Sequence, residues 1–172
     1  HFSWQGNFSS PKSVTGTLTL LKMDGQDLLK IVDPAPPLQI QGVADLQGQL
    51  TLFSQKEQSP PFSYKLADAE VTVENFALMD KEKSILTAPL VKLAPLGFAD
   101  DSLHFGKVQL QKADAQFIHG RIPQSFTSFT TGKYRLQGID FDGQVTFTSE
   151  KKSDQQITFT DVSCKANELD SP

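Results

Sequence analysis

The chain has 172 residues, of which 38% are hydrophobic, and a formal net charge of -4. Only two of its 16 basic residues are arginines, Arg121 and Arg135, and phosphate recognition favours clustered Lys and Arg, so we expect no nucleic-acid partner. A chain of this length can bury a substantial core, and we expect a single β-rich domain over 1–172, with 1–58 and 59–172 as possible sub-units.

The start of the chain and its cysteine content are two further features of the sequence. The chain begins with His1 and contains neither a signal-peptide pattern nor an apolar run of about 18 residues. We therefore expect a piece of a longer protein, with any signal peptide or membrane anchor outside the piece. Cys164 is the single cysteine, so no internal disulfide can form.

The first elements alternate between extended and helical patterns. Residues 2–10 and the Thr-rich residues 13–23 each predict a strand. In the next segment Asp24 is a plausible N-cap, and the apolar residues of LLKIV fall on a helical stripe. Asp33 and Pro34 stop this pattern, which predicts one short helix near 25–33.

The stretch 38–53, LQIQGVADLQGQLTLF, is the longest amphipathic pattern in the chain. Its even positions are apolar or glycine and its odd positions are mostly Gln, Asp and Thr, which is typical of a strand with one apolar and one wet face. Strands usually run about 5 to 6 residues. The stretch is therefore either one long strand or two strands bent at Gly42 or Gly48.

Residues 62–79 change the parity of their apolar positions twice. Phe62, Tyr64 and Leu66 are even, the apolar set 69–73 is odd, and the pattern returns to even at Phe76 and Leu78. A change of parity without a turn residue predicts a β-bulge or a bend. Residues 80–84, DKEKS, predict a charged hairpin tip.

The rest of the chain continues the extended pattern. In 85–98, the most apolar region, Pro89 and Pro95 predict sheet edges or bulges. Residues 103–118 predict another ribbon, 121–132 a loop or irregular edge, and 134–150 with 154–166 a final hairpin. The predicted fold class is mainly β: an antiparallel, curved or sandwich-like sheet of repeated ribs with one short α-helix.

A short pattern beginning with Gly and continuing with alternating apolar residues occurs four times, starting at Gly16, Gly48, Gly106 and Gly143. Two interpretations stay open. The glycines begin strands after turns, or they mark similar ribs stacked side by side.

Few residues suggest catalysis. His104 lies between Leu103 and Phe105 on the polar side of a predicted strand, and His119 precedes Gly120 in a predicted turn. Convergence of Asp100, Asp101 and His104 in a cleft would be needed for an enzyme, but no nucleophile elbow and no metal-binding motif accompanies them. We therefore expect no enzyme, no metal and no cofactor.

Two weaker patterns have simpler explanations. Asp140 and Asp142 resemble a fragment of a calcium loop, but the remaining acidic positions are missing and Asp142-Gly143 is a turn signal. Asn7-Phe8-Ser9 matches a glycosylation sequon, which matters only in a secretory host.

Two segments together resemble the AsmA-like superfamily of bacterial envelope proteins, which includes TamB-like and bridge-type lipid-transport proteins. In 15–52 a strand leads to a Leu-rich helix, a proline break and a ribbon with Gly42 and Gly48; 71–117 runs strand, turn, strand, loop and an FGKVQL strand. The resemblance implies a parent protein anchored in the inner membrane of a Gram-negative bacterium and extending through the periplasm. It also implies curved β-ribs whose apolar concave face carries phospholipid acyl chains.

The resemblance implies a non-catalytic role in lipid transport or outer-membrane biogenesis, with acyl chains and other envelope proteins as partners. Burial contributes about 0.8 kcal/mol per methylene, so an apolar strip on the long ribbon would suffice to hold a chain. The strip consists of Leu38, Ile40, Ala44, Leu46, Leu50 and Leu52.

The same strip is also what an antiparallel sheet packs onto a partner layer. The alternative function is therefore a structural or adhesive β-domain that binds a protein partner through a sheet edge. The two hypotheses differ in whether the apolar face is open or sealed.

Overall fold

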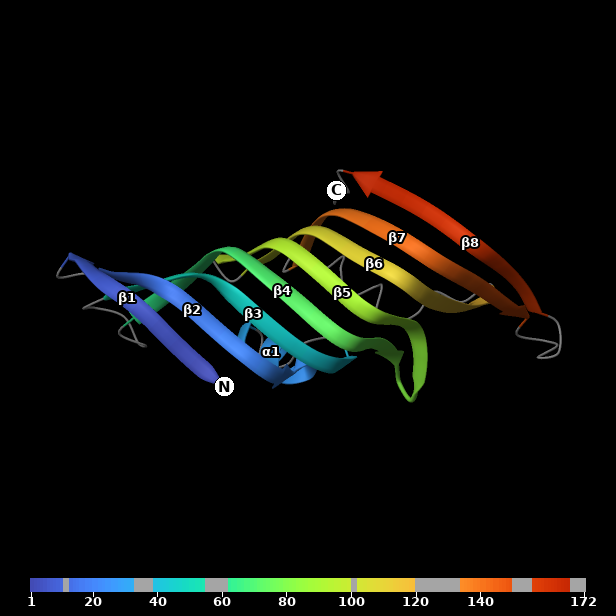
Figure 1. The fold of residues 1–172 in the computed structure, drawn as a ribbon, viewed down its shortest axis with the longest axis horizontal. Helices are drawn as coiled ribbons and strands as arrows, with labels where there is room; N and C mark the ends of the chain where they lie inside the picture. Colours follow the sequence, from blue (N-terminus) through green and yellow to red (C-terminus); the bar gives the residue numbers. More distant parts are fainter. Residues whose placement is uncertain are drawn as a thin grey trace.

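The computed structural model describes residues 1–10, 13–32, 39–54, 62–99, 102–119, 134–149 and 156–167. These residues form one open eight-stranded sheet and a single short helix, α1. The strands follow one another across the sheet in sequence order, so β1 and β8 are the two edges and lie at opposite ends (Figure 1). The predicted mainly β fold class is confirmed in its open, curved form.

The eight strands are long, and all neighbouring pairs except one are antiparallel. The exception is the parallel pair β6–β7. The strands are β1 (Phe2–Ser10), β2 (Ser13–Asp24), β3 (Gln39–Ser54), β4 (Phe62–Asp80), β5 (Lys83–Ala99), β6 (Ser102–His119), β7 (Tyr134–Ser149) and β8 (Gln156–Asn167).

The predicted helix is confirmed as α1 (Gly25–Val32), directly after β2. Asp24 acts as its N-cap, because the backbone N–H of Gln26 donates to the Asp24 carboxylate at 2.8 Å. Asp27 and Lys30 form an exposed ion pair at 2.9 Å on the outer side of the helix. The helix packs with its apolar side on the face formed by β2 and β3.

The stretch predicted as one or two strands is a single strand, β3. Its even positions are the more buried ones through the middle of the strand, so the predicted alternation is confirmed. The pairing of β3 with β4 shifts beside Gly42 and again beside Gly48, the two positions at which the sequence indicated a bend. Gly42 has a φ of 132°, a conformation that side-chain-bearing residues rarely adopt.

The two parity changes predicted in 62–79 coincide with irregularities of β4. Asp68, between Leu66 and Ala69, has a φ of 49°, and the pairing with β5 shifts at this point. Asn75, between Val73 and Phe76, has a φ of 52°. The predicted bulge is confirmed, since each of these residues changes which face the following side chains occupy.

The prolines expected at edges or bulges lie in β5, a central strand paired on both sides. Pro89 falls opposite Asn75 of β4 and Lys112 of β6, both of which have φ values near 52°. The sheet therefore accommodates a proline without an N–H donor because both neighbouring strands are irregular beside it. Pro95 lies against Gly106 of β6, where any Cβ atom would overlap the proline ring.

The four glycines of the repeated pattern lie inside β2, β3, β6 and β7 rather than at strand starts. Of the two interpretations of this pattern, the one in which the glycines begin strands after turns is wrong. The predicted final hairpin is present as the antiparallel pair β7–β8, with the connecting residues outside the described part of the chain.

The two faces of the sheet differ in chemistry. One face carries cross-strand polar pairs, including hydroxyl contacts of 3.1 Å between Thr15 and Thr51 and between Thr146 and Thr158. The other face holds the core, which is centred on β3 to β6 and includes Val91 at 2% exposure. Strand periodicity produces this division together with the irregularities of β4, because successive side chains point to opposite faces and each irregularity restores the apolar side chains to the same face.

Candidate functional site

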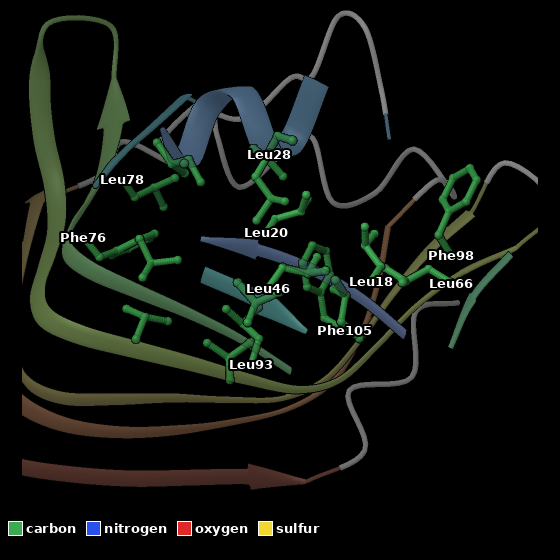
Figure 2. A pocket seen from close by; sticks show the side chains of 18 of the residues that line it. Leu18, Leu20, Leu28, Leu46, Leu66, Phe76, Leu78, Leu93, Phe98 and Phe105 are labelled. Atoms are coloured by element: carbon green, nitrogen blue, oxygen red, sulfur yellow. The ribbon is translucent and has the colours of Figure 1, made fainter. Parts of the chain in front are cut away.

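The apolar face of the sheet is hollowed into a groove of about 750 Å³. Figure 2 shows the sheet curling around this groove, with α1 above it and the side chains of β2 to β6 pointing inward. The volume lies within the range of roughly 300–1,000 Å³ that ligand pockets usually have. The groove is the candidate site among the described residues.

The bulges keep one face of β4 apolar along its whole length. Leu66 lines the groove before the irregularity at Asp68, Val71 and Val73 line it after, and Phe76 and Leu78 line it beyond Asn75. Without these two shifts of parity, about half of these side chains would point to the polar face. The irregular backbone is thus what makes the groove continuous.

The lining is almost entirely hydrocarbon. The described residues that line it are all Leu, Ile, Val, Phe or Gly except Tyr64, and none of them is charged. The ring of Tyr64 stacks on that of Phe98, with centroids 5.1 Å apart. Such a surface can hold an apolar chain by burial.

The six residues predicted to face lipid can be placed individually. Ile40, Leu46, Leu50 and Leu52 line the groove. Ala44, on the same face of β3, is only 1% exposed and belongs to the core cluster. Leu38 lies outside the described residues. Whether the four lining residues contact lipid stays a prediction.

Most of the groove lies beyond the strip predicted on β3. The floor continues over β4, β5 and β6, and Leu28 and Leu29 of α1 add to it from above (Figure 2). Their apolar patterns were visible in the sequence, but a pattern along one element does not indicate which other elements share its face. The further lining residues include Leu66, Val71, Phe76, Leu93, Phe98, Phe105 and Leu110.

The candidate catalytic residue that the structure describes, His104, does not line the groove. His104 is exposed on β6 and is absent from the groove lining. Asp100 and Asp101 lie outside the described residues, and so do the side chains of His119 and Asn7. Of Asp100, Asp101 and His104, only His104 belongs to the described part of the chain.

The two aspartates of the calcium-like fragment are on β7. Asp140 makes an ion pair with Lys107 of β6 at 3.1 Å, and Asp142 is exposed. In the described parts of the chain, no group of three or more His, Cys, Asp or Glu side chains is arranged to hold a metal ion. Cys164 is a free, exposed thiol on β8.

Two further findings concern membrane-spanning helices and similarity to known proteins. Within the described ranges no helix has the length and hydrophobicity needed to cross a bilayer. Comparison with models of known protein families, with curated proteins and with solved structures finds no match to this chain.

Proposed function

We propose that this chain is a non-catalytic lipid-binding β-domain of the bacterial cell envelope, part of an AsmA-like protein that acts in lipid transport or outer-membrane biogenesis. The main support for lipid binding is the open groove of about 750 Å³, in which Tyr64 is the one polar side chain among the described lining residues. A polar metabolite would find almost no hydrogen-bond partner there, whereas an acyl chain needs none.

The energetics support an acyl chain as the ligand. Burial of ten methylenes contributes on the order of 8 kcal/mol before the costs of ordering the chain. The groove runs from Ile40 to Leu52 along β3, so it offers about 12 residues of strand, or roughly 40 Å, of apolar surface. A groove of this length can accept a whole acyl chain while a polar headgroup stays in water.

The envelope setting rests on the resemblance of 15–52 and 71–117 to AsmA-like proteins. That resemblance supports a periplasmic location and a parent protein anchored in the inner membrane. The residues encoded upstream of this chain test that setting, because an apolar anchor is expected there. Absence of any such segment in the full-length protein would count against it.

A matched pair of variants on β3 tests lipid binding. Leu52 and Phe53 are adjacent and equally exposed, at 39% each, but only Leu52 lines the groove. Leu52→Glu places a charge beside the bound chain, and we expect it to weaken binding of a fluorescent fatty acid by roughly tenfold, equivalent to about 1.4 kcal/mol. Phe53→Glu, on the opposite face, should bind as the wild type does; equal losses in both variants would refute a groove-specific site.

The alternative role, binding of a protein partner through a sheet edge, is favoured by β8. This edge strand exposes Ile157 at 63% and Phe159 at 53%, and bare apolar edges invite strand pairing. In that case Phe159→Lys should abolish the complex with the protein partner, as measured by sedimentation, while leaving fatty-acid binding intact. No change of sedimentation in Phe159→Lys would remove the alternative.

A further inference from the structure

The helix α1 lies over the middle of the groove. In Figure 2, Leu28 extends from the helix toward Leu20 of β2, and Leu20 pairs with Leu46 of β3. Leu46 is halfway between Ile40 and Leu52, which are the first and last residues of β3 that line the groove. The lining therefore continues beyond α1 in both directions along β3.

The neighbouring strands show the same arrangement. Phe76 and Leu78 lie to one side of the helix and Leu66 and Phe98 to the other (Figure 2), and all four line the groove. Phe2 of β1, which also lines the groove, is 66% exposed. The helix therefore covers part of the groove without closing it.

The apolar side of α1 has surface left for a ligand. Leu28 and Leu29 pack against the core cluster, yet both are only half-buried and both line the groove. The side of the helix that faces solvent carries the exposed ion pair of Asp27 and Lys30. The accessible part of each leucine consequently faces the groove, where an apolar ligand can bury it.

The position of α1 is fixed at its first turn. The Asp24 carboxylate accepts from the backbone N–H of Gln26, and the side-chain oxygen of Gln26 accepts from the backbone N–H of Ile40, each at 2.8 Å. Gly25 is buried, and an added Cβ there would come within 3.3 Å of Ile40 Cδ1. A helix of eight residues is marginal on its own in water, so these contacts and the two leucines hold α1 in place over the groove.

From these observations we propose that α1 is a roof beneath which the middle of a bound acyl chain passes. Leu28 and Leu29 contact the middle of the chain from the helix, and Leu93 of β5 contacts it from the sheet across the groove. The two ends of the chain lie beyond the helix on either side. This inference rests on the proposed lipid-binding function and adds which part of the chain is shielded from water and which residues shield it.

The first test uses the wild-type protein and three stearic acids that carry a nitroxide near the carboxylate, in the middle of the chain or near the methyl end. Each acid is bound, and reduction of the nitroxide by ascorbate is followed. The label in the middle should be reduced several-fold more slowly than either end label, because α1 keeps water and ascorbate away from it. A middle label that is reduced as fast as the end labels would overturn the roof.

A matched pair of variants on α1 locates the shielding. Leu28→Ala shortens a side chain that faces the groove, and Lys30→Ala shortens one on the solvent side of the same helix. Leu28→Ala should speed reduction of the middle label and leave the end labels unchanged, whereas Lys30→Ala should behave as the wild type does. The same reduction rates in both variants would contradict the assignment of Leu28 to the roof.

A third measurement is independent of how the variants fold. Binding of unlabelled stearic acid to the wild-type protein should slow amide hydrogen exchange in α1, because the chain buries the apolar side of the helix.

The outcomes separate this inference from the proposed function. Equal reduction of the three labels, or unchanged hydrogen exchange in α1 while stearic acid is bound, would overturn the roof and leave lipid binding standing. Failure of the wild-type protein to bind any of the acids would overturn both.

Discussion

Replacement of Gly42 by alanine should destabilise the sheet at the point where β3 bends. Gly42 has a φ of 132°, and a Cβ there would come within 2.7 Å of both the carbonyl oxygen of Glu74 and Val73 Cγ1. Backbone strain of this kind costs about 1–3 kcal/mol, and the overlap with a neighbouring strand adds to it. We expect Gly42→Ala to lower the free energy of unfolding by about 2–4 kcal/mol, measured by urea denaturation.

Gly97→Ala is the control for this experiment. The nearest atom to a Cβ at Gly97 is the carbonyl oxygen of Leu66 at 3.7 Å, an ordinary contact, and its φ lies outside the left-handed region. Restriction of the unfolded chain should make this variant neutral or more stable by about 0.4–1 kcal/mol. Equal effects of the two substitutions would refute the view that the bend at Gly42 requires glycine.

Two further substitutions test contacts around the groove and on the polar face. Asp24→Ala removes the N-cap carboxylate that accepts from the backbone N–H of Gln26. It should lower the free energy of unfolding by about 1 kcal/mol and speed amide hydrogen exchange in α1. Unchanged hydrogen exchange in α1 would contradict the capping role. Lys107→Ala breaks the ion pair with Asp140, but 44% of the lysine side chain is exposed to solvent. We therefore expect urea denaturation to show a decrease of less than about 1 kcal/mol in the free energy of unfolding, and a much larger decrease would contradict the expected solvent screening.

The regular part of the fold is readable from the sequence because strand periodicity is local. The sequence indicates which side chains share the apolar face through the even positions of β3 and through the parity changes around Asp68 and Asn75. The helix α1 was predictable for a similar reason, since its cap and its apolar stripe lie within a few residues of each other.

Features that depend on neighbouring strands were not predictable in the same way. Pro89 indicated an edge or a bulge, yet it lies in central β5, because the irregularities that accommodate it are at Asn75 and Lys112 on other strands. The parallel pairing of β6 with β7 was also not foreseen. Parallel neighbours need a connection of about a dozen residues or more, and the interval between His119 and Tyr134 is long enough for one.

The openness of the apolar face was the property the sequence left undecided. Leu46 and Leu50 have the same alternating pattern whether they pack under a second sheet or line a groove. Among the described residues there is one sheet and one short helix, and both leucines line the groove. The pattern of β3 therefore predicted which face is apolar. Whether that face forms a core or a groove depends on whether other elements of the chain cover it.

The central claim, that the groove holds an acyl chain, is tested most directly by native mass spectrometry of the wild-type protein after incubation with phospholipid vesicles. We predict a complex whose added mass equals that of one or more phospholipid molecules, with Leu52→Glu showing much less of it than Phe53→Glu. A wild-type protein that stays free of lipid, or that binds lipid no better than Leu52→Glu does, would contradict the account.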